Sequence, residues 1–226
     1  MPASVPTIFI PALLCDDLLY EKLIGILGAD IRAEVMLSPL PSLADSAADI
    51  LARAPDKFVL VGTSYGSNLA LEIALAAPER ITALWLMGCD PGAPKPGSAQ
   101  FADGLAATPE ALIDMLAGLV VRPVDAESAA VFRTMAGRVG GNAGAAQAHA
   151  LACRDDLRAR LGELTMPTLV TSGADDALVA PSIGRELAAG LPNAHFHLIE
   201  ECGHLPTLER PEASAALFQA FLAAHL

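Results

Sequence analysis

Aromatic and charged residues are both scarce in this chain of 226 residues. Aromatic residues make up 4% of it and charged residues 18%, whereas hydrophobic residues account for 53%. Much of the apolar content is alanine, which favours helices. No stretch reaches the ~18 uninterrupted apolar residues that a transmembrane helix needs, so we expect no membrane span. The balance indicates a soluble globular protein of a length that single α/β domains often have.

Basic residues are also few. The chain has 14 Lys and Arg against 26 Asp and Glu, which gives a net charge of −12. The basic residues are scattered and form no run. Such a chain repels the phosphates of nucleic acids and anionic membrane surfaces. We therefore expect neither a nucleic-acid partner nor a membrane partner, which leaves a small molecule as the expected partner.

The chain has four cysteines, and none of them forms a CxxC pair. Their spacing suits neither a zinc site nor a small disulfide framework. The N-terminal apolar stretch has no basic residue ahead of it, which is not typical of a signal peptide. We therefore expect no metal, and free thiols in a reducing cytoplasm. The cysteines are Cys15, Cys89, Cys153 and Cys202.

Short apolar runs alternate with longer alanine-rich helical stretches along the chain. The expected strands cover residues 7–10, 33–37, 58–62, 83–87, 168–172 and 194–199. These runs are apolar without alternation, which is typical of strands buried on both faces. The pattern predicts an α/β fold with a mainly parallel sheet of about six strands and helices on both faces.

One stretch, residues 91–164, interrupts this alternation because it contains no convincing strand. It begins with a loop rich in Pro and Gly and continues as helical pieces, two of which we expect at 110–121 and 126–139. We interpret it as an inserted helical cap; the alternative is that these helices only cover the sheet. The predicted organisation is a core of residues 1–90 and 165–226 with a cap at 91–164.

The strongest chemical signal is the sequence GTSYG at residues 62–66. It follows a run of strand length and opens an apolar helix, so Ser64 would lie on a sharp, strained turn with its hydroxyl exposed above the sheet. Glycines two residues to each side, Gly62 and Gly66, remove Cβ atoms that would collide with neighbouring backbone. The helix start also directs free N–H groups at incoming negative charge. Ser64 is the candidate nucleophile.

A serine nucleophile needs a base, and the base needs an orienting acid. His204 lies just after the last expected strand, where α/β sheets place their sites, and is the candidate base; His149 is the reserve. Asp175 and Asp176 both follow the preceding strand, and the order Ser, Asp, His suits this fold. Asp90, after the strand that follows the serine helix, is a third option for the acid.

These motifs resemble those of the α/β-hydrolase fold superfamily over nearly the whole chain outside the cap. GTSYG resembles the nucleophile elbow, TMPTLVTSGADDALVAP the acid segment and CGHLPTLERPEA the histidine segment. In the acid segment the aspartate three residues after a glycine is the acid, so Gly173 selects Asp176. The resemblance implies an α/β-hydrolase fold with Ser64, Asp176 and His204 as catalytic residues.

IPALLCDD resembles the loop that supplies the oxyanion hole. The backbone N–H groups of Tyr65 and Leu13 are the expected donors. The family usually has His-Gly or Pro-Gly in this loop, whereas this chain has Pro11-Ala12. We expect the Cβ of Ala12 to reshape the hole. Cys15 in this loop and Cys202 near the histidine also suggest sensitivity to thiol reagents.

The resemblance implies a serine hydrolase of the carboxylic ester hydrolase type (EC 3.1.1-like) that needs neither cofactor nor metal. It would cleave an ester, thioester or lactone through an acyl-Ser64 intermediate. A C–C bond hydrolase or an acyltransferase on the same triad is the alternative, and a non-enzymatic ligand-binding protein is a second. A C–C hydrolase would need an anchor for a substrate carboxylate, and the candidates are Arg122, Arg133, Arg138 and Arg154; the favoured alternative is that these four are solvated surface charges.

Overall fold

The computed structural model describes residues 5–226, and its centre is a single sheet of six parallel strands. The strand order is β2-β1-β3-β4-β5-β6, and every neighbouring pair is parallel. The predicted parallel sheet is therefore confirmed. The strands are β1 (Val5–Ile10), β2 (Ile31–Val35), β3 (Phe58–Thr63), β4 (Ile81–Met87), β5 (Thr168–Gly173) and β6 (Ala194–Ile199).

The central and edge strands differ in burial. Every residue of β3 and of β5 is buried, because helices cover both faces of the sheet centre. In β2 and β6 half-buried and exposed residues alternate. The expectation that all six strands are buried on both faces is wrong for these two, which lie at the sheet edges and have a neighbouring strand on one side only.

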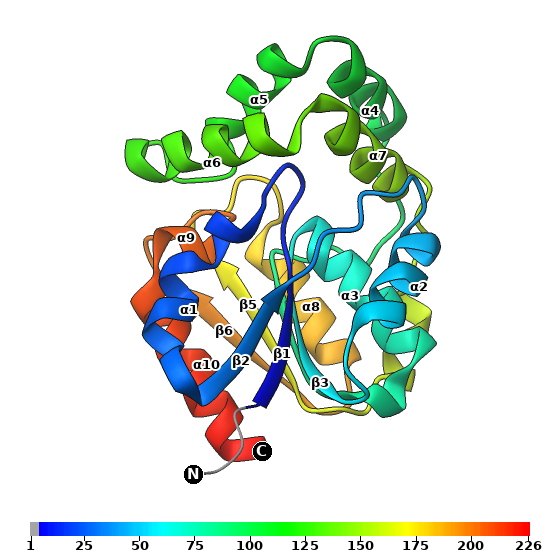
Figure 1. Cartoon of the computed structure of the whole chain (residues 1–226), viewed down its shortest axis with the longest axis vertical. Helices are drawn as coiled ribbons and strands as arrows, with labels where there is room; N and C mark the ends of the chain where they lie inside the picture. The colour runs from blue at the N-terminus through cyan, green and yellow to red at the C-terminus, as the bar shows by residue number, and fades with distance from the viewer. Residues whose placement is uncertain (1–4) are drawn as a thin grey trace.

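Helices pack on both faces of the sheet, as predicted (Figure 1). On one face lie α1 and α10, and Phe218 of α10 stacks on Trp85 of β4 with ring centroids 4.6 Å apart. On the other lie α2, α3 and α8, whose buried side chains form one hydrophobic cluster with Leu60 of β3 and Leu84 of β4. The bounds are α1 (Glu21–Leu27), α2 (Leu43–Arg53), α3 (Tyr65–Ala76), α8 (Pro181–Gly190), α9 (Pro206–Glu209) and α10 (Pro211–His225). Short 3-10 turns cover Asp17–Leu19, Gly28–Asp30, Pro78–Arg80 and Arg158–Glu163.

Local sequence explains where these helices begin. Ser42 accepts a hydrogen bond from the N–H of Asp45 and so caps α2, as its residue type favours. Pro181 and Pro211 open α8 and α10 at a position where the missing N–H costs nothing. Within residues 5–226 no helix combines the length and the apolar character needed to cross a membrane.

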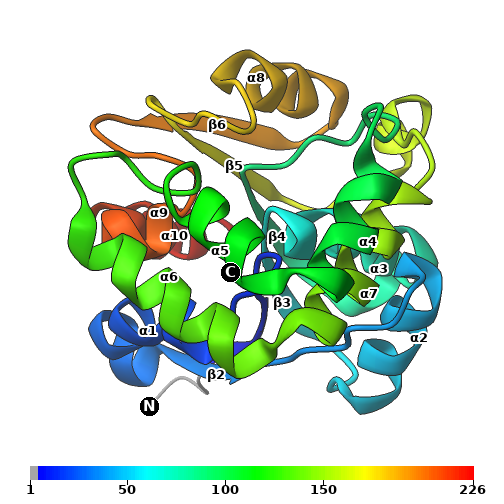
Figure 2. The ribbon, with the colours of Figure 1, turned by 90° about the horizontal axis from the view of Figure 1, so that it is seen from above.

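Four further helices connect β4 to β5 and lie together above the carboxyl ends of the strands (Figures 1 and 2). They are α4 (Ser98–Ala107), α5 (Pro109–Ala117), α6 (Ala126–Val139) and α7 (Gly141–Ala152), and we call them the α4–α7 layer. Residues 91–164, all of them described, contain no strand. The helix α5 ends before the expected residue 121, because the chain turns at Gly118, whose N–H bonds back to Met115. Buried side chains of the layer join the hydrophobic core on the α1 and α10 face.

Candidate active site

Ser64 lies at the turn between β3 and α3 in a conformation that L-residues rarely adopt, with φ 55° and ψ −113°. Its N–H donates to the carbonyl of Met87 at 2.8 Å, which ties the turn to β4. A Cβ on Gly62 would collide with the carbonyl of Gly66, and a Cβ on Gly66 with the carbonyl of Ile10 in β1. The predicted need for glycine on both sides of Ser64 is therefore confirmed.

His204 and Asp176 form a buried pair at the same edge of the sheet. Nδ1 of His204 lies 2.7 Å from Oδ2 of Asp176. The other oxygen, Oδ1, accepts the N–H groups of Leu178 and Val179, each at 2.9 Å. Burial alone would raise the pKa of Asp176, but the hydrogen bond and charge of His204 and the two N–H donors together lower it. The carboxylate is thus held ionised and fixed against the imidazole.

The other candidate acids and the reserve base have different partners. Asp175 is largely exposed and pairs with Nε of Arg122 at 2.9 Å. Asp90 accepts the N–H of Gly92 at 3.0 Å, so the only candidate carboxylate bonded to His204 is that of Asp176. His149 in α7 lies 3.3 Å from Asp103 of α4 and joins these two helices instead.

The loop that carries His204 is held by a carboxylate that was not predicted from the sequence. Oε1 of Glu209 accepts the N–H of Gly203 at 3.0 Å, and Oε2 accepts the N–H of Arg122 at 2.9 Å. Burial raises the pKa of Glu209, which the N–H donors oppose. Gly88 has φ 55° and leaves room for the imidazole of His204, because a Cβ on Gly88 would lie 2.8 Å from Cε1 of that ring. The Glu-x-Pro pattern after the histidine was the available signal for Glu209.

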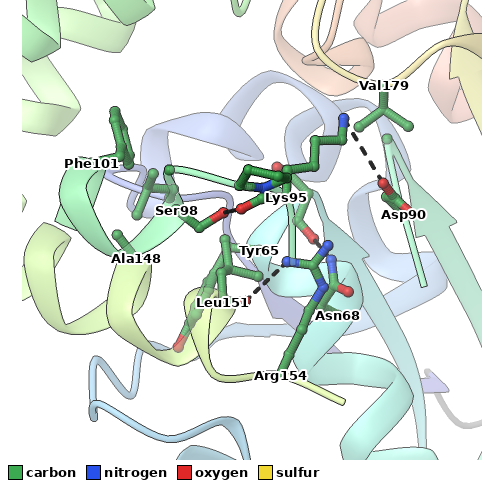
Figure 3. A pocket seen from close by; sticks show the side chains of 15 residues that line it. Tyr65, Asn68, Asp90, Lys95, Ser98, Phe101, Ala148, Leu151, Arg154 and Val179 are labelled. Atoms are coloured by element: carbon green, nitrogen blue, oxygen red, sulfur yellow. Dashed lines mark hydrogen bonds and ion pairs between the residues drawn. The ribbon is translucent and has the colours of Figure 1, made fainter. Parts of the chain in front are cut away.

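A cavity of about 330 Å³ opens beside Ser64, between the sheet and the α4–α7 layer (Figure 3). Its wall is made mostly of apolar side chains, together with a few polar ones such as Asn68 and Asp90. Within the described chain no hydrogen bond joins Ser64 to His204; in unliganded enzymes such contacts are often long and tighten with substrate. The lining residues are Leu13, Ser64, Tyr65, Asn68, Gly88, Asp90, Lys95, Pro96, Gly97, Ser98, Phe101, Ala148, Leu151, Arg154 and Val179.

Both expected oxyanion donors, Tyr65 and Leu13, line this cavity with Ser64. Tyr65 is the first residue of α3, where N–H groups have no partner within the helix and the helix dipole is positive. Over residues 5–226, neither Tyr65 nor Leu13 donates its N–H to a loop or cap acceptor. The two N–H groups are therefore free to bind an oxyanion.

The four candidate arginines separate into two groups. Arg122, Arg133 and Arg138 pair with acids, which are Asp175, Asp114 and Asp16 respectively. Arg154 lines the cavity and donates instead to the carbonyls of Gly92, Leu151 and Ala93. Of the four, Arg154 alone lines the cavity and has no carboxylate of residues 5–226 within 4.0 Å of its nitrogens; the charge of Asp90, on the same wall, acts on it from farther away.

The thiols near the site are poorly placed for reaction. Cys15 and Cys202 are fully buried, and burial raises the pKa of each thiol far above its usual value. A thiol that is neither accessible nor ionised reacts slowly, so the expected sensitivity to thiol reagents is not supported. Cys153 is the exposed thiol of the four. Among the residues described, no group of three or more His, Cys, Asp or Glu is placed to hold a metal ion.

Known proteins with similar sequences and folds match the chain over most of its length. A hydrolase of 2-hydroxy-6-oxononadienedioate and 2-hydroxy-6-oxononatrienedioate from Paraburkholderia xenovorans is 31% identical over 93% of this chain and 75% of its own. A pimeloyl-(acyl-carrier protein) methyl ester esterase from Aromatoleum aromaticum is 29% identical over 75% of this chain and 76% of its own. The enol-lactonase of Burkholderia xenovorans shares the fold with a TM-score of 0.88, at 19% identity, over 97% of this chain and 92% of that one. The sequence model of the alpha/beta hydrolase family matches residues 25–217, and the chain therefore belongs to the α/β-hydrolase family.

Proposed function

We propose that this α/β hydrolase cleaves a carboxylic ester, thioester or lactone through an acyl-Ser64 intermediate. The observation that carries the proposal is the buried His204–Asp176 pair, 2.7 Å apart, at the same sheet edge as the strained Ser64 turn. A serine on such a turn with an oriented imidazole nearby is the arrangement that acyl transfer requires. The match to an esterase and the shared fold of an enol-lactonase support the same reaction class.

The proposed reaction has two halves. Nε2 of His204 takes the proton of Ser64 while Oγ bonds to the carbonyl carbon, and the N–H groups of Tyr65 and Leu13 stabilise the oxyanion. The imidazolium of His204 then gives that proton to the leaving alcohol or thiol as its bond to the carbonyl carbon breaks. In the second half His204 activates a water, which attacks the acyl group and releases the acid and free Ser64. Throughout, Asp176 fixes the tautomer of His204 and stabilises its charged form.

The α4–α7 layer gives this site its shape. We propose residues 91–164 as a cap over a core of 1–90 and 165–226. A cavity of about 330 Å³ is at the small end of the range for ligand sites, which favours a short to medium acyl or alcohol group. Phe101, Leu151 and Val179 supply apolar wall from the layer and from the acid loop. The cap thus supplies apolar wall that can hold an apolar part of the substrate beside Ser64.

Hydrolysis of p-nitrophenyl esters of increasing chain length tests the proposal. We expect turnover of short esters and a decline once the acyl chain outgrows the cavity. A fluorophosphonate should stop turnover and add its mass to the peptide that contains Ser64. Failure to hydrolyse any ester, thioester or lactone, with saturable binding of these compounds, would instead support a non-enzymatic ligand-binding protein.

A second candidate function is hydrolysis of a substrate that carries a carboxylate, including the C–C bond hydrolases considered above. The observation that favours it is Arg154, a half-buried cation on the cavity wall without a carboxylate partner among residues 5–226 (Figure 3). Burial lowers the pKa of Arg154, so an anion that compensated its charge would be bound favourably. The Paraburkholderia relative acts on a dioate, a compound with two carboxylates.

We expect Arg154→Met to discriminate between charged and neutral substrates. For a p-nitrophenyl monoester of a dicarboxylic acid, kcat/KM should fall about tenfold to a hundredfold, since a charge-assisted hydrogen bond contributes about 1.5–3 kcal/mol. For the neutral ester of the same length it should change little. Arg133→Met is the matched control, because Arg133 is an exposed partner of Asp114. Equal losses on both esters would show that Arg154 acts on structure rather than on substrate charge.

A further inference from the structure

The loop after β1 makes a tight turn from Ala12 to Cys15. The N–H of Cys15 donates to the carbonyl of Ala12 at 3.0 Å, and Leu14 has φ 61°. Leu13 is not among the residues with positive φ. A negative φ followed by a positive φ at the two central positions is the pattern of a type II turn, which favours Gly or Asn at the second. Leucine occupies that position here and disfavours a positive φ, so contacts with other parts of the structure must stabilise the turn.

This turn determines where the N–H of Leu13 points. The carbonyl of Ala12 and the N–H of Leu13 belong to one planar peptide unit, so fixing one end fixes the other. Cys15 holds the carbonyl end. Leu13 lines the cavity with Ser64, and its N–H is the expected second oxyanion donor. Loss of the bond from Cys15 to Ala12 would therefore free this peptide to rotate and would take the donor away from the reacting carbonyl.

The helix α7 of the layer supports the turn from above. Oε1 of Gln147 accepts the N–H of Leu14 at 3.0 Å, and the Gln147 side chain is buried. The Leu14 side chain packs against Gly144, one turn earlier on α7, so closely that a Cβ at Gly144 would collide with Cδ2 of Leu14. In a type I turn the central peptide has the opposite orientation, and the N–H of Leu14 would point away from Gln147. Gln147 therefore holds the central peptide in the type II orientation and offsets the unfavourable φ of Leu14, which keeps the turn and its closing bond from Cys15 to Ala12 formed.

We propose that Gln147 is a positioning residue for the oxyanion hole, acting through Leu14 on the N–H of Leu13. The proposal rests on the hydrolase mechanism given above. Its consequence is that the α4–α7 layer does more than cover the cavity: seating α7 on the loop completes the oxyanion hole. The bond from Gln147 also explains how a loop with Ala12 in place of the usual glycine keeps a defined shape, since the support comes from a residue 133 positions away.

Gln147→Met tests this, because methionine keeps the length and volume of the side chain but offers no comparable acceptor. Loss of one oxyanion donor costs about 10²–10³ in kcat, so a displaced donor should cost about tenfold to a hundredfold, with little change in KM. A trifluoromethyl ketone, to whose carbonyl carbon Ser64 Oγ adds, places its oxyanion in the hole. Its affinity should fall by a similar factor, whereas the affinity for the planar carboxylic acid product should not.

Two further variants make the result decisive. Gln147→Glu keeps an acceptor of the same reach and should recover most of the activity that Gln147→Met loses. Gln100→Met, on the exposed side of α4, is the matched control and should behave like the parent. The melting temperature of each variant shows whether the fold is kept.

The outcomes separate this proposal from the proposed function. If the parent hydrolyses esters and Gln147→Met matches it in kcat and in ketone affinity, Gln147 does not position the donor. Equal weakening of ketone and product binding, or a Gln147→Glu variant as slow as Gln147→Met, would also overturn the positioning role. If the parent itself hydrolyses no ester, thioester or lactone, the proposed function fails first, and the two failures are not confused.

Discussion

Replacing Ser64 with alanine is expected to lower kcat for a p-nitrophenyl ester by at least about a thousandfold, as removal of a triad nucleophile does. The reason is that alanine leaves no oxygen to bond to the carbonyl carbon, so the acyl-enzyme cannot form. The backbone strain at φ 55° is the same for serine and alanine, and the fold should therefore be unaffected. The measurement is steady-state hydrolysis, with intact mass to detect the acyl adduct.

Ser98→Ala is the matched control for that loss. Ser98 lines the same cavity, but its hydroxyl donates to the carbonyl of Lys95 at 2.7 Å and has no base beside it. We expect this variant to keep activity within about threefold of the parent, since one exposed hydrogen bond contributes little. If Ser64→Ala still forms an acyl adduct, the nucleophile is another residue and the assignment of Ser64 is wrong.

The parts of the fold that sequence predicts well are those that local chemistry determines. The run at 58–62, which ends in Gly62 and is followed by Ser64 and Gly66, predicts both the central strand β3 and the turn at Ser64, because both depend on neighbouring residues. The helix α6 is found at the expected residues, bounded by the cap of Asp125 and by Gly140. The edge strands were less well predicted, since exposure depends on a missing neighbouring strand that composition does not reveal.

The hydrogen-bond partner of His204 was harder to predict than the strands. From the residues alone Asp175 and Asp176 are equivalent, and only the family pattern around Gly173 selects one. In the structure the loop directs Asp176 to His204, while Asp175 points to Arg122 at the surface. This difference arises from the path of the loop rather than from the type of residue.

Other contacts could not be predicted from the sequence because they join segments that are far apart in the chain. Gln147 meets Leu14, and Glu209 meets Arg122, across 133 and 87 positions respectively. The first pair has no periodic or motif signal, and the Glu-x-Pro pattern marks Glu209 without indicating its partner, because each contact depends on how the α4–α7 layer sits on the core. The layer was predicted as helical, but its contribution to the histidine and oxyanion loops appears only in three dimensions.

Replacing Asp176 with asparagine is expected to lower kcat by about 10³–10⁴, for a reason specific to this loop. Oδ1 of Asp176 accepts the N–H groups of Leu178 and Val179, so in the variant the amide oxygen should keep that position. The amide NH₂ would then replace Oδ2 and donate to Nδ1 of His204. That places the ring proton on Nε2, where the imidazole can no longer accept the proton of Ser64.

Asp175→Asn is the control, because it changes the adjacent residue in the same way. It breaks only an ion pair with Arg122 at the surface, where such pairs contribute about 0–1 kcal/mol, so activity should stay within about threefold of the parent. The pKa of Asp176 is lowered, so its carboxylate is ionised throughout the neutral range of an ester assay, and protonation of Asp176 should not limit the activity of the parent or of Asp175→Asn within that range. If Asp175→Asn instead caused the larger loss, the acid would be the neighbouring residue, and the loop would have to rearrange on substrate binding to bring Asp175 to His204.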